Sequence, residues 1–107
     1  MTLEELRIAN TLRNKEWDPD GQIDVGFRSI EMMGEVGEMF NVVKKLERER
    51  MGLRGSRDTK EHLAEEMADV LICLDLIAMQ LGINLTEAVR LKFNASSEKH
   101  NLSVFLL

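Results

Sequence analysis

Cysteine, proline and tyrosine are almost missing from this chain of 107 residues, which has one cysteine, one proline and no tyrosine. A single cysteine, Cys73, excludes an intrachain disulfide, and its place in the apolar run 70–74 predicts a small buried hydrophobic side chain. One proline, Pro19, and few runs of β-branched residues argue against strands. We therefore expect an all-α chain without covalent cross-links.

Long apolar runs and dense groups of basic residues are also absent. No apolar run approaches the ~20 residues that a membrane-spanning helix needs, so no membrane segment is expected. The formal net charge is −5, and the chain has no cluster of lysine and arginine that could neutralise the phosphates of a nucleic acid. The first residues show neither the basic nor the apolar part of a secretory signal. We predict a cytoplasmic protein that binds neither nucleic acid nor membrane.

The composition is otherwise that of an ordinary globular protein. Hydrophobic residues make up 44% and charged residues 31% of the chain, which argues against disorder and leaves enough apolar surface for a modest core. No internal repeat, low-complexity segment or linker divides the sequence. We therefore expect residues 1–107 to form a single domain.

Residues suited to capping mark four predicted helices. The helices are expected over about 3–14, 24–50, 59–81 and 85–99. The residues expected to cap the first, second and fourth of them are Thr2 (with Glu5 as a capping box), Asp24, and either Asn84 or Thr86. Gly82 is the residue type expected just beyond a helix, and it should end the third.

The second and third helices differ in how their apolar residues are spread. In the third, apolar residues recur every three or four positions, as a stripe suited to antiparallel packing: Leu63, Met67, Val70, Leu74, Ile77 and Leu81. In the second, they cover more than half of the circumference, which is too much for a helix with one neighbour. The apolar segment 101–107 should pack on the body or on another subunit. We predict a four-helix bundle assembled through oligomerisation, as a homodimer or a homotetramer made of two dimers.

Two pairs of acidic residues carry the functional signal. Glu35 and Glu38 are three residues apart on the second predicted helix, and Glu66 and Asp69 have the same spacing on the third. Residues so spaced leave one face of a helix, and their like charges repel unless a cation lies between them. Four carboxylates brought together suit a hard divalent cation such as Mg²⁺. On a helical wheel Glu66 falls inside the apolar stripe, where an acid is costly unless it is paired or metal-bound.

Other catalytic and metal-binding patterns are missing. The chain has no Glu-x-x-His pair for a di-iron bundle, and its two histidines, His62 and His100, lack zinc-site spacing. It also has no glycine-rich phosphate loop and no Ser–His–Asp pattern. A solvated helix face is the simple explanation for either acidic pair alone. Two pairs on adjacent helices, one of them entering an apolar stripe, favour a metal site.

The spacing of the four acids resembles the signature of MazG-like nucleoside triphosphate pyrophosphohydrolases. Glu35-x-x-Glu38 is followed, after 27 intervening residues, by Glu66-x-x-Asp69 and the apolar run 70–72. Three further segments extend the likeness over about residues 15 to 100: the turn at 81–88, Lys92-Phe93-Asn94 and Lys15-x-Trp17. The chain departs from the family at Gly34, where members often have a second glutamate.

The resemblance implies an all-α, four-helix MazG-like fold and a specific reaction. Mg²⁺, with Mn²⁺ as a substitute, would be held by the four acids: Glu35, Glu38, Glu66 and Asp69. The substrate would be a (deoxy)nucleoside triphosphate, cleaved between its α and β phosphates to a nucleoside monophosphate and pyrophosphate. Glu38, supported by Glu35, is the expected catalytic carboxylate that orients or deprotonates a water molecule.

Four residues are expected to contact the substrate. The resemblance implies that Lys92 and Asn94 bind phosphate or sugar oxygens, with Lys45 as a further candidate. Trp17 is the only tryptophan, and it either stacks on the base or serves as a core anchor or loop plug. Two alternative functions stay open. They are a phosphoribosyl-ATP pyrophosphatase with the same metal chemistry, and a non-catalytic helical oligomer that binds a metal or a partner.

Overall fold

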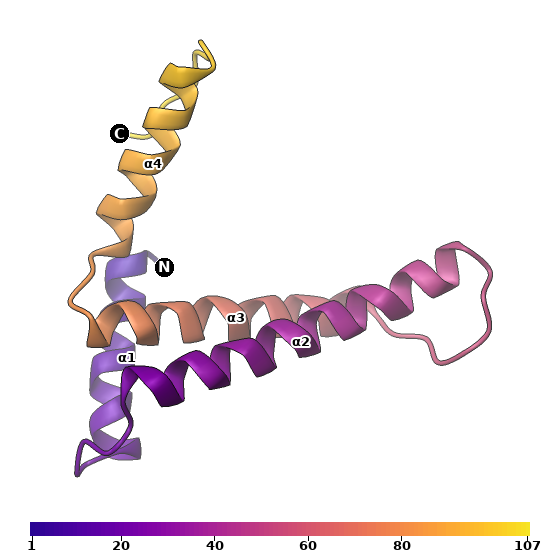
Figure 1. Cartoon of the computed structure of the whole chain (residues 1–107), viewed down its shortest axis with the longest axis horizontal. Coiled ribbons are helices and arrows are strands. Elements are labelled where there is room, and N and C mark those ends of the chain that lie inside the picture. The colour runs from indigo at the N-terminus through magenta and orange to yellow at the C-terminus, as the bar shows by residue number, and fades with distance from the viewer.

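Four helices and no strand make up the computed structural model, which describes all of residues 1–107. The helices are α1 (Leu3–Trp17), α2 (Val25–Arg50), α3 (Lys60–Gln80) and α4 (Leu85–Lys99). α2 and α3 lie side by side as a long antiparallel hairpin, α1 crosses one end of it, and α4 projects away (Figure 1). The predicted all-α, four-helix architecture is confirmed.

Local hydrogen bonds place the helix ends where the sequence predicts them. Thr2 Oγ1 accepts a hydrogen bond from the Glu5 N–H, and the Glu5 carboxylate accepts one from the Thr2 N–H, which completes the capping box. Asp24 and Asn84 each accept from the backbone N–H three residues further on. Gly82 adopts a φ of 66° beyond α3, a conformation that only glycine adopts without cost. Only α1 runs clearly further than predicted.

Few residues of the chain are buried, and half of these are polar or charged. Eight residues are buried: Asn10, Arg28, Val42, Cys73, Asp75, Leu76, Ala78 and Ser97. Cys73 is 7% exposed, as predicted for a small hydrophobic side chain. Burial, together with the nearby charges of Glu31 and Glu35, raises the pKa of the thiol to about 11, so it is a neutral thiol at neutral pH.

The apolar stripe predicted on the third helix is only partly covered within the chain, where Leu63, Val70 and Ile77 are half-buried. Met67, Leu74 and Leu81 are 55%, 40% and 54% exposed. The side of α3 that meets α2 and α1 instead carries the buried Cys73 and Leu76. Periodicity located the covered side only in part because α3 is apolar on more than one side, and only the position of its neighbours decides which side is covered.

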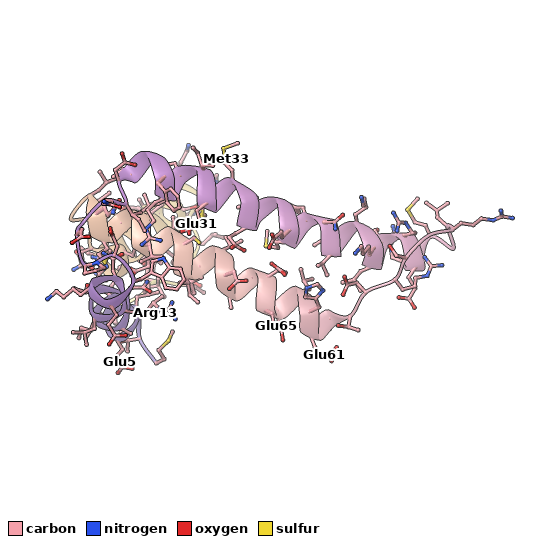
Figure 2. All side chains as sticks on the ribbon, turned by 90° about the horizontal axis from the view of Figure 1, so that it is seen from below. Glu5, Arg13, Glu31, Met33, Glu61 and Glu65 are labelled. Carbon is pink, nitrogen blue, oxygen red and sulfur yellow. The ribbon has the colours of Figure 1, made fainter.

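The chain is more open than a single folded domain of its length usually is. Its radius of gyration is 17.3 Å, whereas about 13 Å is typical for ~100 residues. Ile30, Met33 and Phe40 on α2 are 73%, 75% and 58% exposed, and Met33 points away from α3 (Figure 2). Within one chain the helices therefore leave a large apolar surface uncovered.

The last residues fold back along α4. The Asn94 side chain donates a hydrogen bond to the carbonyl of Leu106 and accepts one from its N–H, at 2.8 and 2.7 Å. Ser97 Oγ donates to the carbonyl of Val104. The apolar side chains of this segment stay open to solvent, with Val104 64% and Phe105 50% exposed. The backbone of the tail is therefore fixed, while its apolar surface adds to the uncovered area.

None of the four helices alone has the length and apolar composition of a membrane span. Taken together, α3 and α4 pass that test of length and composition, but the chain bends by 106° between them.

Candidate metal centre

Carboxylates from both arms of the hairpin converge at one point. Glu35 and Glu38 on α2 and Glu66 on α3 each place a carboxylate oxygen within 4.8 Å of the other two. Asp69, one turn beyond Glu66, is exposed at the margin, near enough for its charge to act on Glu35. The structure thus brings three of the four predicted acids together, with the fourth beside them.

The electrostatics of this cluster favour a bound cation. Burial raises the pKa of Glu35, and the charges of Glu38, Asp69 and Glu66 raise it further. Glu35 Oε2 and Glu66 Oε2 are buried with no hydrogen-bond partner. Buried carboxylate oxygens without partners are costly, and a divalent cation satisfies them together. The residues present therefore fit a metal ion on both charge and donor type.

We predict that Glu35→Gln stabilises the metal-free protein at neutral pH. Because the folded-state pKa of Glu35 lies above its usual value, the folded chain binds this proton more tightly than the unfolded chain does. Stability from this group is therefore greatest at acid pH and is lost as the pH rises through the folded-state pKa. In chelator-treated samples the variant should melt a few degrees higher at neutral pH, with the difference shrinking on acidification.

A companion measurement separates this effect from a general change in packing. Added Mg²⁺ should raise the melting temperature of the wild-type protein and have little effect on Glu35→Gln, which has lost a ligand. A lower melting temperature for the metal-free variant at neutral pH would contradict the assignment of Glu35 to a strained acidic cluster.

Glu66 has a basic neighbour, whereas no ion pair reaches Glu35 or Glu38. His62 Nε2 lies 3.0 Å from Glu66 Oε1, and His62 Nδ1 lies 2.8 Å from Asp58 Oδ1. The hydrogen bond to Asp58 is the largest cause that raises the pKa of His62. Sequence reasoning missed this contact, although spacings of four residues from 58 to 62 to 66 would have indicated it.

A pocket of about 290 Å³ opens beside the acids, between α1, α2 and α3. Its lining includes Glu35, Trp17, Arg28, Glu31, Asn14 and Cys73. Arg28 is 4% exposed, donates to Glu31 and to the Asn14 side-chain oxygen, and keeps a buried Nε without a partner. Trp17 is 78% exposed, so the interpretation of it as a core anchor is wrong for this chain. The pocket therefore places the ring of Trp17 and the unpartnered Nε of Arg28 beside Glu35 of the acid cluster.

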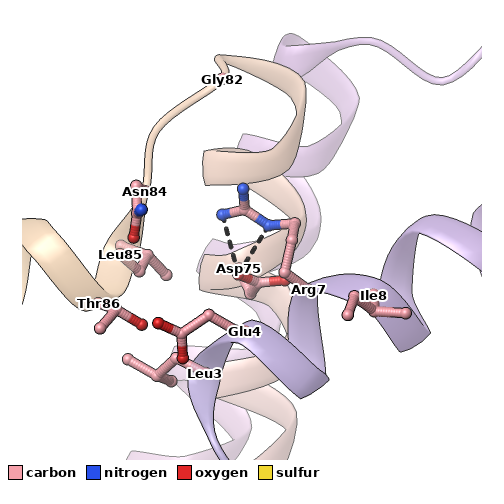
Figure 3. A pocket seen from close by; sticks show the side chains of 9 residues that line it. All are labelled: Leu3, Glu4, Arg7, Ile8, Asp75, Gly82, Asn84, Leu85 and Thr86. Atoms are coloured by element: carbon pink, nitrogen blue, oxygen red, sulfur yellow. Dashed lines mark hydrogen bonds and ion pairs between the residues drawn. The ribbon is translucent and has the colours of Figure 1, made fainter.

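A larger pocket, of about 400 Å³, lies where α1 meets the start of α4 (Figure 3). Here Arg7 pairs with Asp75 and also donates to the carbonyl of Ile83, at 2.8 Å. None of the acids of the cluster lines it. Asp75 and its partners join α1 to α3, and the sequence offered no sign of them beyond an acid within an apolar run.

The predicted substrate-binding residues Lys92 and Asn94 lie away from the acids in a single chain, and Lys45 is engaged by another carboxylate. Lys45 lies on α2 but is 3.7 Å from Asp58, with which it forms an ion pair. Lys92 and Asn94 lie on α4, which leaves the hairpin, and the Asn94 amide is already bonded to Leu106. Their contact with substrate stays a prediction, and it requires either movement of α4 or a second chain.

Comparison with known proteins identifies one family. A family model described as the MazG nucleotide pyrophosphohydrolase domain matches residues 30–101. No curated protein and no solved structure matches the chain. The matched segment runs from within α2 to just beyond α4, so it includes all four acids and leaves α1 outside.

Proposed function

This chain belongs to the MazG nucleotide pyrophosphohydrolase family, and we propose that it hydrolyses (deoxy)nucleoside triphosphates between the α and β phosphates in a Mg²⁺-dependent reaction. The products are a nucleoside monophosphate and pyrophosphate. One observation carries the metal dependence, which is the convergence of three carboxylates with two buried, unpartnered oxygens. Oxygen ligands of this kind suit Mg²⁺, with Mn²⁺ as a substitute.

The cation would be held by Glu35, Glu38 and Glu66, with Asp69 approaching from the margin. Bound there, Mg²⁺ would neutralise the charge that develops on the phosphates in the transition state. Glu38 is the exposed member of the cluster, so water from solvent reaches its carboxylate. That carboxylate orients the water and accepts its proton as the water attacks phosphorus.

The pocket beside Glu35 suits the nucleoside part of the substrate. Its volume, about 290 Å³, is near the lower end of the range of about 300–1,000 Å³ usual for small-molecule sites. It therefore has room for a base and sugar, while the phosphates extend over the acids. The exposed ring of Trp17 offers a stacking surface, and Arg28 Nε offers a free donor.

A panel of substrates tests the reaction. Purified protein with Mg²⁺ should release pyrophosphate from at least one ribo- or deoxyribonucleoside triphosphate, and Glu38→Gln and Asp69→Asn should greatly reduce that release. Exclusive turnover of phosphoribosyl-ATP would replace the proposed substrate class. If both variants match the wild-type sample, the hydrolysis comes from a contaminant, and a non-catalytic oligomer becomes the better description.

We also propose that a second copy of the chain covers the exposed face of α2 and completes the active site. This face carries Ile30, Met33 and Phe40, all more than half exposed, and Lys92 and Asn94 are remote from the acids of their own chain. A second copy would bury the apolar face and could bring its α4 to the acids.

The double substitution Met33→Glu with Phe40→Glu should separate the copies. Charges placed in an apolar interface are strongly unfavourable, so sedimentation should show a dimer or tetramer for the wild type and a monomer for the variant. Hydrolysis should fall at least about tenfold, because Lys92 and Asn94 of a second copy no longer reach the substrate, and misplaced positioning groups can cost about 100-fold in rate. Met51→Glu, at an exposed methionine outside α2, is the matched control. A wild-type monomer with full activity would contradict the proposal.

A further inference from the structure

Four side chains form a continuous line from the loop end of α2 to the acid cluster. Lys45 Nζ on α2 lies 3.7 Å from Asp58 Oδ2, and Asp58 Oδ1 lies 2.8 Å from His62 Nδ1. His62 Nε2 then lies 3.0 Å from Glu66 Oε1. The side chains of Asp58 and Glu66 are 12% and 13% exposed, while that of His62 is 43% exposed. The two carboxylates are thus sheltered and the ring between them reaches solvent.

Asp58 is itself firmly held. Besides the ring and Lys45, its Oδ1 accepts a hydrogen bond from the Thr59 N–H at 2.8 Å. This backbone contact and the His62 hydrogen bond lower the pKa of Asp58, so it is a carboxylate at neutral pH. Because an ionised carboxylate only accepts, the ring nitrogen facing it must donate. Asp58 therefore fixes the orientation of the His62 ring from the side away from the cluster.

The two carboxylate oxygens of Glu66 have different surroundings. When both ring nitrogens carry a proton, Nε2 donates to Oε1 at 3.0 Å, while Oε2 is buried and has no partner. Glutamate has a long, flexible side chain, and a fixed donor on one oxygen limits the rotamers it can adopt. The oxygen that remains is the one available to a cation shared with Glu35 and Glu38.

We propose that His62, oriented by Asp58, is a positioning residue that holds Glu66 in the conformation that binds the cation. The inference rests on the proposed metal-dependent function. It adds that the end of the 51–59 loop, through Asp58, and α2, through Lys45, help to set the affinity of the metal site. Hydrogen-bonded partners of ligating carboxylates commonly have this effect.

Two substitutions at His62 separate positioning from simple support of the fold. In His62→Gln the side-chain amide nitrogen can replace Nε2, which keeps a donor near Glu66 and loses Asp58. In His62→Asn the amide nitrogen can replace Nδ1, which keeps a partner for Asp58 and loses Glu66. The two variants therefore each remove a different contact of His62, the one to Asp58 or the one to Glu66, with side chains of similar polarity.

Binding of Mn²⁺ to the full chain, followed by electron paramagnetic resonance of the free ion, gives a measurement that does not depend on turnover. His62→Asn should weaken Mn²⁺ binding about 10- to 100-fold, and His62→Gln should weaken it less, because this variant keeps the contact to Glu66 and loses only the orientation by Asp58. The melting temperatures of the metal-free variants should be similar to each other. His100→Asn, at the other histidine, which is exposed, should bind Mn²⁺ as the wild type does.

The outcomes distinguish this inference from the proposed function. If Glu66→Gln and Glu38→Gln lose Mn²⁺ binding while His62→Asn keeps wild-type affinity, the positioning role is wrong and the metal site stands. The role is also wrong if both His62 variants weaken binding equally, because the contact to Glu66 then has no special part. If Glu66→Gln and Glu38→Gln bind Mn²⁺ normally, the acid cluster is not the metal site and the proposed function fails as well.

Discussion

Glu66→Gln is expected to lower the rate of pyrophosphate release by more than about 100-fold, beyond the effect usual for partners of a metal ligand. Glutamine keeps the size of the side chain but removes its negative charge. Glu66 is the contribution of α3 to the three convergent carboxylates, and its Oε2 is one of the two buried oxygens without a partner. Its loss leaves a cation with ligands from α2 alone, apart from Asp69 at the margin.

The matched control is Glu65→Gln. Glu65 is adjacent in sequence, but its side chain is exposed and lies on the side of α3 turned away from α2, as does Glu61 (Figure 2). Both variants lose one negative charge from the same helix turn, so a general electrostatic effect on substrate approach would appear in both. Rates measured over a range of Mg²⁺ concentrations should show a loss in Glu66→Gln only. Equal rates for the two variants would remove Glu66 from the metal site.

Asp75→Ala is expected to destabilise the folded chain by about 3 kcal/mol, the lower end of the range of about 3–5 kcal/mol for removing one partner of a buried ion pair, because the Arg7 side chain is 25% exposed and keeps access to water. Asp75 is 1% exposed, and its two oxygens accept from Arg7 Nε at 3.1 Å and from the Asn10 amide at 2.9 Å. The substitution leaves Asn10, also 1% exposed, without its closest partner. Because native domains are stable by only about 5–15 kcal/mol, this is a large part of the total.

Urea unfolding followed by circular dichroism measures this loss, with Asp20→Ala as the control. Asp20 is exposed, in the turn after α1, and its removal should change the free energy of unfolding by less than about 0.5 kcal/mol. Asp75 joins α1 to α3, so its loss should also free α1 and, with it, Trp17 beside the pocket. A change in stability no larger than that of the control would show that this buried pair contributes little to the fold.

Local features of the sequence were enough to predict the helices. Thr2, Asp24 and Asn84 cap α1, α2 and α4 through hydrogen bonds to the backbone three residues on. Such contacts depend on a few consecutive residues, so they can be read without knowledge of the rest of the fold. The same holds for Gly82, whose positive φ ends α3. Spacing of three residues likewise placed both acids of each pair on one helix face.

Features that depend on distant parts of the chain were only partly predictable. The intrusion of Glu66 into an apolar stripe pointed correctly to a sheltered carboxylate, 13% exposed in its side chain. The stripe itself is only half covered, because Leu63, Val70 and Ile77 are half-buried whereas Met67, Leu74 and Leu81 stay exposed. The apolar surface that actually packs contains Cys73 and Leu76, and the pattern of apolar residues alone did not distinguish the two sides.

The number and limits of the helices, the pairing of the acids and the family of the chain could therefore all be read from the sequence. The meeting of Glu35 and Glu38 with Glu66 across the hairpin, and the place of Asp69 at the margin, depend on how the helices pack. The burial of Asp75 against α1 depends on that packing as well. The two kinds of feature differ in how far apart in the sequence the contacting residues lie. Caps and helix faces arise from residues three or four apart, whereas these contacts join residues that are far apart in sequence, and their closeness follows from how whole helices pack.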